Sequence, residues 1–256
     1  MTQEEMNILV PEKLKRIEEE NHVTVLYAAE SGSRAWGFES PDSDFDVRFI
    51  YKRPRSEYLR LESMRDVIEI PMNETWDVSG WDLAKALRLL NKSNPALYDW
   101  LGSPVCYVDN GFRERVFPLL QIFFSEKKML CHYYGIASRE IKAIFGESTV
   151  KPKRYFYALR SVLACLWIEQ NGTAPPVRFS DLTDAVLPDE VRPSLENLYK
   201  IKRNSPEKTG TEHLKVIDKF LKEKQEEIYA VIGRLPKERP IGWEKLNAFF
   251  AAELDG

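Results

Sequence analysis

Two short segments near the N-terminus have the residue patterns of β-strands: one is apolar almost throughout, and the other alternates between apolar and polar residues. Residues 23–29 are apolar or β-branched almost without interruption, which is typical of a strand covered on both faces. The two faces of residues 44–51 differ: one carries Phe45, Val47, Phe49 and Tyr51, and the other carries Asp44, Asp46, Arg48 and Ile50. This alternation predicts a second strand that directs both carboxylates to one side.

Two further strands and an N-terminal helix complete the first part of the chain. Residues 65–71 and 74–78 predict strands joined by a short turn at Met72-Asn73, so we expect a mixed sheet of four or more strands. Residues 11–20 predict a charged amphipathic helix with Pro11 in its first turn, where a missing N–H costs little.

From about residue 80 the spacing of apolar residues becomes helical. The predicted helices cover residues 82–90, 95–101, 113–134, 136–145, 153–169, 182–185, 188–201, 211–232 and 243–254. Segments 171–181 and 204–210 are rich in helix-breaking residues and are interpreted as interruptions rather than domain linkers. We therefore expect an α+β fold: a small mixed β-sheet with helices over residues 1–108, then a mainly α-helical part over residues 109–256.

Composition narrows the class of protein. A chain of 256 residues can bury a core without disulfides or a structural metal, and Cys106, Cys131 and Cys165 lack the spacing of either. The acidic N-terminus and the absence of a long apolar run predict a soluble, cytoplasmic protein without a membrane partner. With 37 basic and 40 acidic residues, the chain has no overall attraction for nucleic acid, and only local basic clusters remain as candidates.

The turn after the first strand has the residues of a phosphate-binding loop. Gly32 permits tight backbone geometry and close approach of a ligand, while Ser31 and Ser33 offer donors to phosphate oxygens. Arg34 adds a fork of N–H donors. A Ser-Gly-Ser turn is also common in loops that bind nothing.

Asp44 and Asp46 are spaced to share a metal ion. On a strand, residues i and i+2 lie roughly 7 Å apart and point the same way, so the two carboxylates can converge on one or two Mg²⁺ ions. Transfer of a nucleotidyl group requires that the triphosphate charge be neutralised, a task commonly given to such ions. The alternative is a solvated turn, since residues 41–44 have turn-forming composition. An aspartate inside an apolar strand, where burial of an unpaired carboxylate is costly, favours the metal site.

These residues carry a resemblance to a known superfamily. Gly32-Ser33, the ten-residue gap and Asp44-Phe45-Asp46 resemble the GS…DxD signature of the polymerase-β-type nucleotidyltransferases. Residues 30–37 and 40–48 are similar to the RNA-ligase-associated predicted nucleotidyltransferase family. Further matches lie at residues 80–87, at Asn94-Pro95 with Trp100-Leu101, and at residues 153–168, so the resemblance spans most of the chain.

The resemblance implies a third metal-binding carboxylate on a later strand. Asp77 fits best, and Asp82 and Glu69 fit less well. Asp44, Asp46 and Asp77 would then be the catalytic and metal-binding residues, with two Mg²⁺ ions, or Mn²⁺, as cofactor. Alternatively, Asp77 caps the helix that begins near residues 79–82. Arg48 is either a partner of these carboxylates, a phosphate contact or a member of an ordinary strand ion pair.

A basic helix follows in the second half of the chain. Lys153, Tyr157 and Arg160 lie at positions i, i+4 and i+7, opposite an apolar face. Members of the superfamily commonly supply lysine or arginine to the triphosphate from a helix after the catalytic head, so these three residues are candidates for that role. A solvated helix face is the alternative.

The resemblance implies a metal-dependent nucleotidyltransferase of the EC 2.7.7 type. It would bind a nucleoside triphosphate such as ATP, move the nucleoside monophosphate to an acceptor hydroxyl and release pyrophosphate. The family name suggests an RNA end, and hence RNA repair. The rival interpretations are a non-catalytic nucleotide-binding regulator, such as an antitoxin-like partner, and a plain RNA-binding module. Base preference, acceptor, protein partner and oligomeric state are left open.

Overall fold

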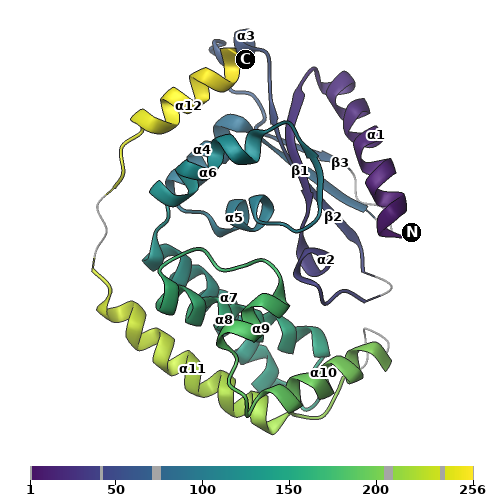
Figure 1. Ribbon diagram of the computed structural model, residues 1–256, viewed down its shortest axis with the longest axis vertical. Coiled ribbons are helices and arrows are strands. Elements are labelled where there is room, and N and C mark those ends of the chain that lie inside the picture. The colour runs from purple at the N-terminus through teal and green to yellow at the C-terminus, as the bar shows by residue number, and fades with distance from the viewer. Residues whose placement is uncertain (1, 41–42, 71–75, 205–209, 237–239, 256) are drawn as a thin grey trace. The chain divides into compact units, whose positions relative to one another are not determined.

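The chain forms two compact units, each described here by itself. The computed structural model describes residues 2–40, 43–70, 76–204, 210–236 and 240–255. The first unit comprises residues 1–36, 43–123 and 240–256, and the second comprises residues 37–42 and 124–239 (Figure 1). This division differs from the expected boundary at residue 108, because helix α6 (Phe112–Ile122) packs on strand β1 and the C-terminal helix α12 (Glu244–Asp255) packs on α4.

A five-stranded mixed sheet forms the centre of the first unit. Its order is β3-β4-β2-β1-β5, and its strands are β1 (Thr24–Glu30), β2 (Phe45–Lys52), β3 (Val67–Ile70), β4 (Trp76–Asp82) and β5 (Cys106–Asp109). Strands β2 and β4 are parallel, and the other neighbouring pairs are antiparallel. The α+β prediction is therefore confirmed.

Two details of the sheet differ from the sequence prediction. The edge strand β5 is only four residues long and partly exposed, so it leaves little hydrophobic pattern to detect. Strand β4 continues to Asp82 because it pairs along its length with β2 and over its second half with β3. The predicted turn at Met72-Asn73 lies outside the described residues.

Helix α1 (Gln3–Asn21) covers one face of the sheet. Its buried side chains belong to the same apolar cluster as the predicted inner face of β2, and that cluster includes Met6, Val10, Leu14, Ile17, Phe45, Val47, Phe49 and Tyr51. The predicted assignment of residues to the two faces of β2 is confirmed on this side.

The helix α1 begins eight residues earlier than predicted, and Pro11 lies inside it. A capping box sets its start: the Thr2 hydroxyl accepts from the Glu5 N–H, and the Glu5 carboxylate accepts from the Thr2 N–H. The Thr-x-x-Glu spacing of this box is present in the sequence, and it sets the helix start more strongly than Pro11 does.

The opposite face of the sheet is covered by α4 (Leu83–Asn91), α5 (Pro95–Leu101) and α6 (Figure 1). Two short helices, α2 (Gly32–Trp36) and α3 (Arg55–Tyr58), follow β1 and β2. Gly80 allows the close packing of β2 against β4, because a Cβ at this position would lie 2.2 Å from the Phe49 ring.

The second unit is helical. It contains α7 (Glu126–Gly146), α8 (Pro152–Asn171), α9 (Phe179–Val186), α10 (Arg192–Asn204) and α11 (Lys215–Arg234). The predicted helix 113–134 is wrong as one element: α6 ends at Ile122, and the Ser125 hydroxyl accepts from the Lys128 N–H at 3.2 Å to start α7. Helix α7 then passes through Gly135 without a break. None of the described helices combines the length and apolar character needed to cross a membrane.

Candidate active site

Asp46 and Asp77 lie opposite each other on the parallel strands β2 and β4. Both lie on the face of the sheet away from α1, and their side chains are 30% and 37% exposed. Asp77 is a strand residue, and the cap of α4 is instead Asp82, whose carboxylate accepts from the Ala84 N–H at 2.8 Å. The helix-cap interpretation of Asp77 is therefore wrong.

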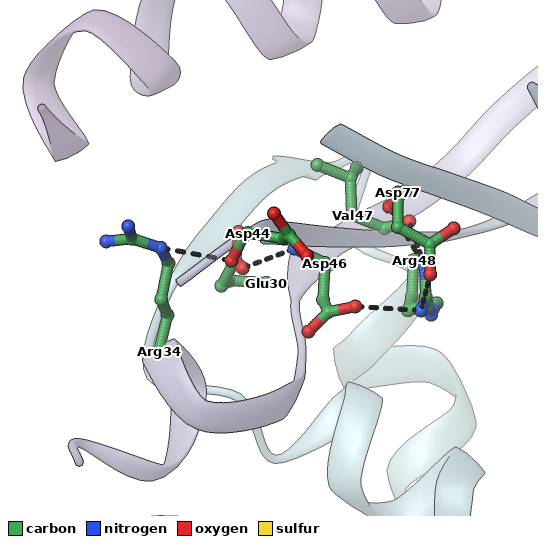
Figure 2. A network of polar contacts seen from close by, with 7 residues as sticks. All are labelled: Glu30, Arg34, Asp44, Asp46, Val47, Arg48 and Asp77. Carbon is green, nitrogen blue, oxygen red and sulfur yellow. Dashed lines mark hydrogen bonds and ion pairs between the residues drawn. The ribbon is translucent and has the colours of Figure 1, made fainter. Parts of the chain in front are cut away.

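Asp44 directly precedes β2 and is exposed. It stands two residues before Asp46, at the spacing that places alternate side chains of an extended chain on one side. Asp46 and Asp77 thus lie side by side near the beginning of two neighbouring strands, and Asp44 precedes the first of them (Figure 2). Their role as metal ligands stays a prediction.

The Ser31-Gly32-Ser33 turn rests directly against Asp46. The Ser31 N–H donates to the Asp46 carbonyl at 2.8 Å, which extends the pairing of β1 with β2. Gly32 has a positive φ of 63°, and a Cβ at this position would lie 2.2 Å from Asp46 Oδ2. Only glycine satisfies both the backbone conformation and the approach of the carboxylate.

Arg34 closes the loop between the turn and β2. Its Nη2 donates to the Ser43 carbonyl at 2.6 Å, and its Nε lies 3.2 Å from the Asp44 carbonyl. The guanidinium also lies 3.8 Å from the centre of the Phe45 ring. Arg34 therefore holds the two halves of the sequence motif together, and its predicted contact with phosphate stays a prediction.

Arg48 lies between the two strand carboxylates. Its Nη2 is 3.0 Å from Asp46 Oδ1 and 2.6 Å from Asp77 Oδ2, and its Nη1 donates to the Asp77 carbonyl at 2.9 Å (Figure 2). These ion pairs fit both the carboxylate-partner and the ordinary strand ion-pair interpretations of Arg48. A cation here reduces the repulsion between two adjacent carboxylates.

The donor chemistry of the site fits Mg²⁺, which prefers carboxylate oxygens. In the described part of the chain, however, no three carboxylate, imidazole or thiol side chains are grouped closely enough to hold an ion as they stand. Each of Asp46 and Asp77 gives one oxygen to Arg48. An ion that used these two oxygens would therefore compete with Arg48 for them.

Glu30 is a residue of the site that the sequence interpretation did not single out. Its side chain is fully buried at the end of β1, where one carboxylate oxygen accepts from the Asp46 N–H at 2.7 Å. The other oxygen accepts from the Tyr107 hydroxyl. Burial raises the pKa of Glu30 to about 7, against the two hydrogen bonds, which lower it. The signal in the sequence was a charged residue that ends an apolar strand directly before Ser31.

The predicted phosphate-binding residues of α8 belong to the second unit. Lys153 is exposed, and its Nζ lies 5.9 Å from the centre of the half-buried Tyr157 ring. Arg160 is buried, with its guanidinium 6.0 Å from the Tyr133 ring. The predicted charged face is wrong beyond Lys153, because α8 is buried on nearly all sides as the central helix of this unit. The phosphate-binding role of these residues stays a prediction.

A mixed sheet sets the Gly-Ser turn beside Asp46 of the DxD motif, with Asp77 on the neighbouring strand, as the resemblance to the superfamily implies. The class of protein is thus a polymerase-β-type nucleotidyltransferase. The family model of the RNA repair pathway DNA polymerase beta family (RlaP) matches residues 6–252, and the chain belongs to this family.

Two individual proteins are similar to this chain. The uncharacterized protein YcgL of Bacillus subtilis (strain 168) is 40% identical over 238 residues, which are 92% of each chain. The crystal structure of a nucleotidyltransferase-like protein from Exiguobacterium sibiricum 255-15 matches at 12% identity over 86% of this chain and 73% of that one. The TM-score of this match is 0.29.

Proposed function

We propose that the protein is a magnesium-dependent nucleotidyltransferase that moves a nucleoside monophosphate from a nucleoside triphosphate to an acceptor hydroxyl. The observation that supports this most strongly is the position of Asp46. Its carboxylate packs against Gly32, and Asp77 is its paired residue on the neighbouring strand β4. A phosphate held at the Ser31-Gly32-Ser33 turn would therefore be next to the carboxylates. Pyrophosphate is the second product.

Each acidic residue has a separate role in this proposal. Asp44 and Asp46 would hold the ions that neutralise the triphosphate, and Asp77 would hold the ion that activates the acceptor hydroxyl. Mg²⁺ held by them would supply neutralisation of the triphosphate charge and a lower pKa for the acceptor hydroxyl. Ser31 and Ser33 donate hydrogen bonds to phosphate oxygens, and Gly32 lets the backbone approach them.

Arg48 keeps the site assembled in the absence of substrate. Without a cation, Asp46 and Asp77 would repel each other across neighbouring strands, and Arg48 offsets this by bonding to both. We propose that Arg48 yields carboxylate oxygens when the metal-bound triphosphate enters.

The proposal also names an acceptor for the nucleoside monophosphate. An RNA end as acceptor is suggested by the description of the family, which names an RNA repair pathway. The phosphate contact predicted for Lys153, which is exposed in the first turn of α8, stays a prediction.

The test is a transfer assay with α-labelled triphosphates. The four nucleoside triphosphates are screened against RNA, protein and small-molecule acceptors, with release of pyrophosphate as readout. Asp46→Asn is expected to lower the rate by roughly 10²–10³-fold, the scale seen when one electrostatic contact to a transition state is removed. Asp189→Asn, at a side chain that is 97% exposed in the second unit, is the matched control. Equal transfer by Asp46→Asn and wild type would refute the proposed metal site.

A non-catalytic nucleotide-binding regulator is the second candidate. The observation in its favour is that Arg48 already bonds to both strand carboxylates, so the site is stable without metal. Calorimetry distinguishes the two functions: the regulator would bind nucleotide equally well with and without Mg²⁺ and would release no pyrophosphate.

A further inference from the structure

A groove in the first unit lies between α4 and α12, and its volume is about 450 Å³. Its lining includes Leu87 and Arg88 from α4 and Lys92 from the C-cap of that helix. On the other side it includes Trp243, which directly precedes α12, and Asn247 and Phe250 from α12. The volume is within the range of sites that hold a small organic ligand, roughly 300–1,000 Å³. None of the proposed metal-binding or phosphate-binding residues lines this groove.

The groove combines aromatic surface with positive charge. Trp243 is 46% exposed. Phe250, seven residues further along the chain, is half-buried. Arg88 in the last turn of α4 and Lys92 at its C-cap are four residues apart, and both line the groove. The described lining residues include no acidic side chain, although the whole chain has a net charge of −3. The carboxylate of Asp82, near Arg88, already accepts from the Ala84 N–H and the Tyr58 hydroxyl.

The two walls of the groove are fixed by contacts at both ends of the C-terminal segment. Before α12, the Ile241 carbonyl accepts from Asn91 Nδ2 at 3.3 Å. At the other end, the buried Glu253 accepts from Arg115 at 2.5 and 3.0 Å, and its carbonyl accepts from Lys52 Nζ at 2.6 Å. A groove held in this way needs little reorganisation on binding, which favours affinity.

We propose that this groove binds a phosphorylated nucleoside, with the base on Trp243 and the phosphate at Arg88 and Lys92. Aromatic side chains stack on any base, and neighbouring cations bind the phosphate, which is the combination used in single-strand binding. Asn247 offers an amide to the edge of the base. The ligand is either a free mononucleotide or a nucleotide of single-stranded RNA, and both share this chemistry.

The experiment measures binding to the full-length protein in EDTA, which prevents metal-dependent binding at the carboxylates. AMP is titrated by calorimetry, and a short fluorescein-labelled single-stranded RNA is titrated by anisotropy. Adenosine and ribose 5-phosphate, each with half of the recognised chemistry, are expected to bind at least tenfold more weakly than AMP. Binding of RNA without AMP identifies the strand as the source, and binding of AMP with equal or greater affinity identifies the mononucleotide.

Variants separate the groove from general charge attraction. Trp243→Ala and the double change Arg88→Ala with Lys92→Ala are each expected to weaken binding about tenfold or more. Trp243→Phe, which keeps a stacking ring and guards against misfolding, is expected to bind within about threefold of wild type. Lys245→Ala removes a charge from an exposed position of α12 outside the groove and is expected to change little.

The proposal is independent of the proposed transferase activity. Asp46→Asn is expected to retain full binding in the groove, so a loss of transfer and a loss of groove binding are distinguishable. The proposal is overturned if neither probe binds at millimolar concentration. It is equally overturned if Trp243→Ala binds as wild type, or if Lys245→Ala loses as much affinity as the double change.

Discussion

At the scale of single residues, the candidate active site depends on the contacts that surround Asp46. Asp46 is bonded through its side chain to Arg48, through its N–H to Glu30, and through its carbonyl to the Ser31 N–H. Its carboxylate also covers Gly32. Changes at these neighbours should therefore affect the site as strongly as changes at the carboxylates.

Gly32→Ala is expected to destabilise the fold by about 2–4 kcal/mol, because it adds backbone strain at a positive φ and a clash with Asp46 Oδ2. Gly37→Ala is the matched control: Gly37 also has a positive φ, of 80°, but a Cβ there meets nothing within 4 Å. Urea unfolding of both variants measures the difference. Equal losses would show that the contact with Asp46 contributes nothing.

Glu30→Gln tests the buried carboxyl group through the pH dependence of stability. The pKa of Glu30 is raised to about 7 in the folded protein, above its ordinary value of 4.5. The folded state therefore binds the proton more tightly, and the stability that this contributes is present below pH 4.5 and lost as the pH rises through 7.

Wild type is accordingly expected to lose stability between pH 5 and 8 relative to Glu30→Gln, whose side chain does not ionise. Urea unfolding at pH 5, 6, 7 and 8 measures this difference. A constant difference between the two proteins over this range would contradict the raised pKa.

At the scale of elements, the register of β2 and β4 and the docking of α12 decide what the site and the groove look like. A shift of one residue between parallel strands would move Asp77 to the face that packs on α1. The paired apolar residues Val47 and Val78 favour the observed register, because both are buried in the cluster beneath α1. The α12 helix buries two side chains, Leu246 and Glu253, and the Glu253 carboxylate is bonded to Arg115.

Arg115→Gln is expected to destabilise the protein by about 1–2 kcal/mol, because it leaves the Glu253 carboxylate, only 6% exposed, without its charged partner. The expected loss of stability is smaller than for a fully buried ion pair, because the Arg115 side chain is 45% exposed to solvent. Arg55→Gln is the control, because its partner Asp255 is 64% exposed. Surface ion pairs contribute roughly 0–1 kcal/mol, so this variant is expected to lose less than about 0.5 kcal/mol of stability. Similar losses for the two variants, measured by urea unfolding, would contradict this account of how α12 is anchored.

At the scale of the whole molecule, each of the two units is assembled from separate stretches of chain. The chain leaves the first unit after Trp36, returns at residue 43, leaves again after Phe123 and returns at residue 240. The short excursion is held in the second unit by Phe38, whose ring stacks on Phe156 at 5.0 Å and meets the edge of Phe179 at 5.5 Å. It separates the Gly-Ser turn from Asp44 in the sequence.

Removal of α12 by truncation after residue 236 should destabilise the first unit even though the sheet remains intact. The truncation exposes the surface that buries Leu246 and the contacts of Phe249 with Phe112 and of Phe250 with Tyr58. Burial of such side chains contributes about 1.5–3 kcal/mol each, so a loss of roughly 3–5 kcal/mol is expected. Thermal unfolding of the truncated and complete chains measures it, and an unchanged Tm would show that α12 does not belong to this unit.

Local features of this protein were determined by the sequence. The alternation in residues 44–51 placed Asp44 and Asp46 on the polar face of a strand, because successive side chains of a strand must point to opposite sides. The mixed sheet, most of the helices and the turn at Gly32 followed from patterns that involve only neighbouring residues. The start of α1 was missed although its signal, the capping box at Thr2, is equally local.

Only the tertiary structure decided which distant residues meet. The register that sets Asp77 beside Asp46, the burial of Glu30 behind Asp46 and the return of α12 to the first unit join residues far apart in the chain. The same holds for Arg160, which helical spacing placed on a charged face and which the surrounding helices bury. Such contacts depend on the packing of whole elements, which the periodicity of a single segment does not encode.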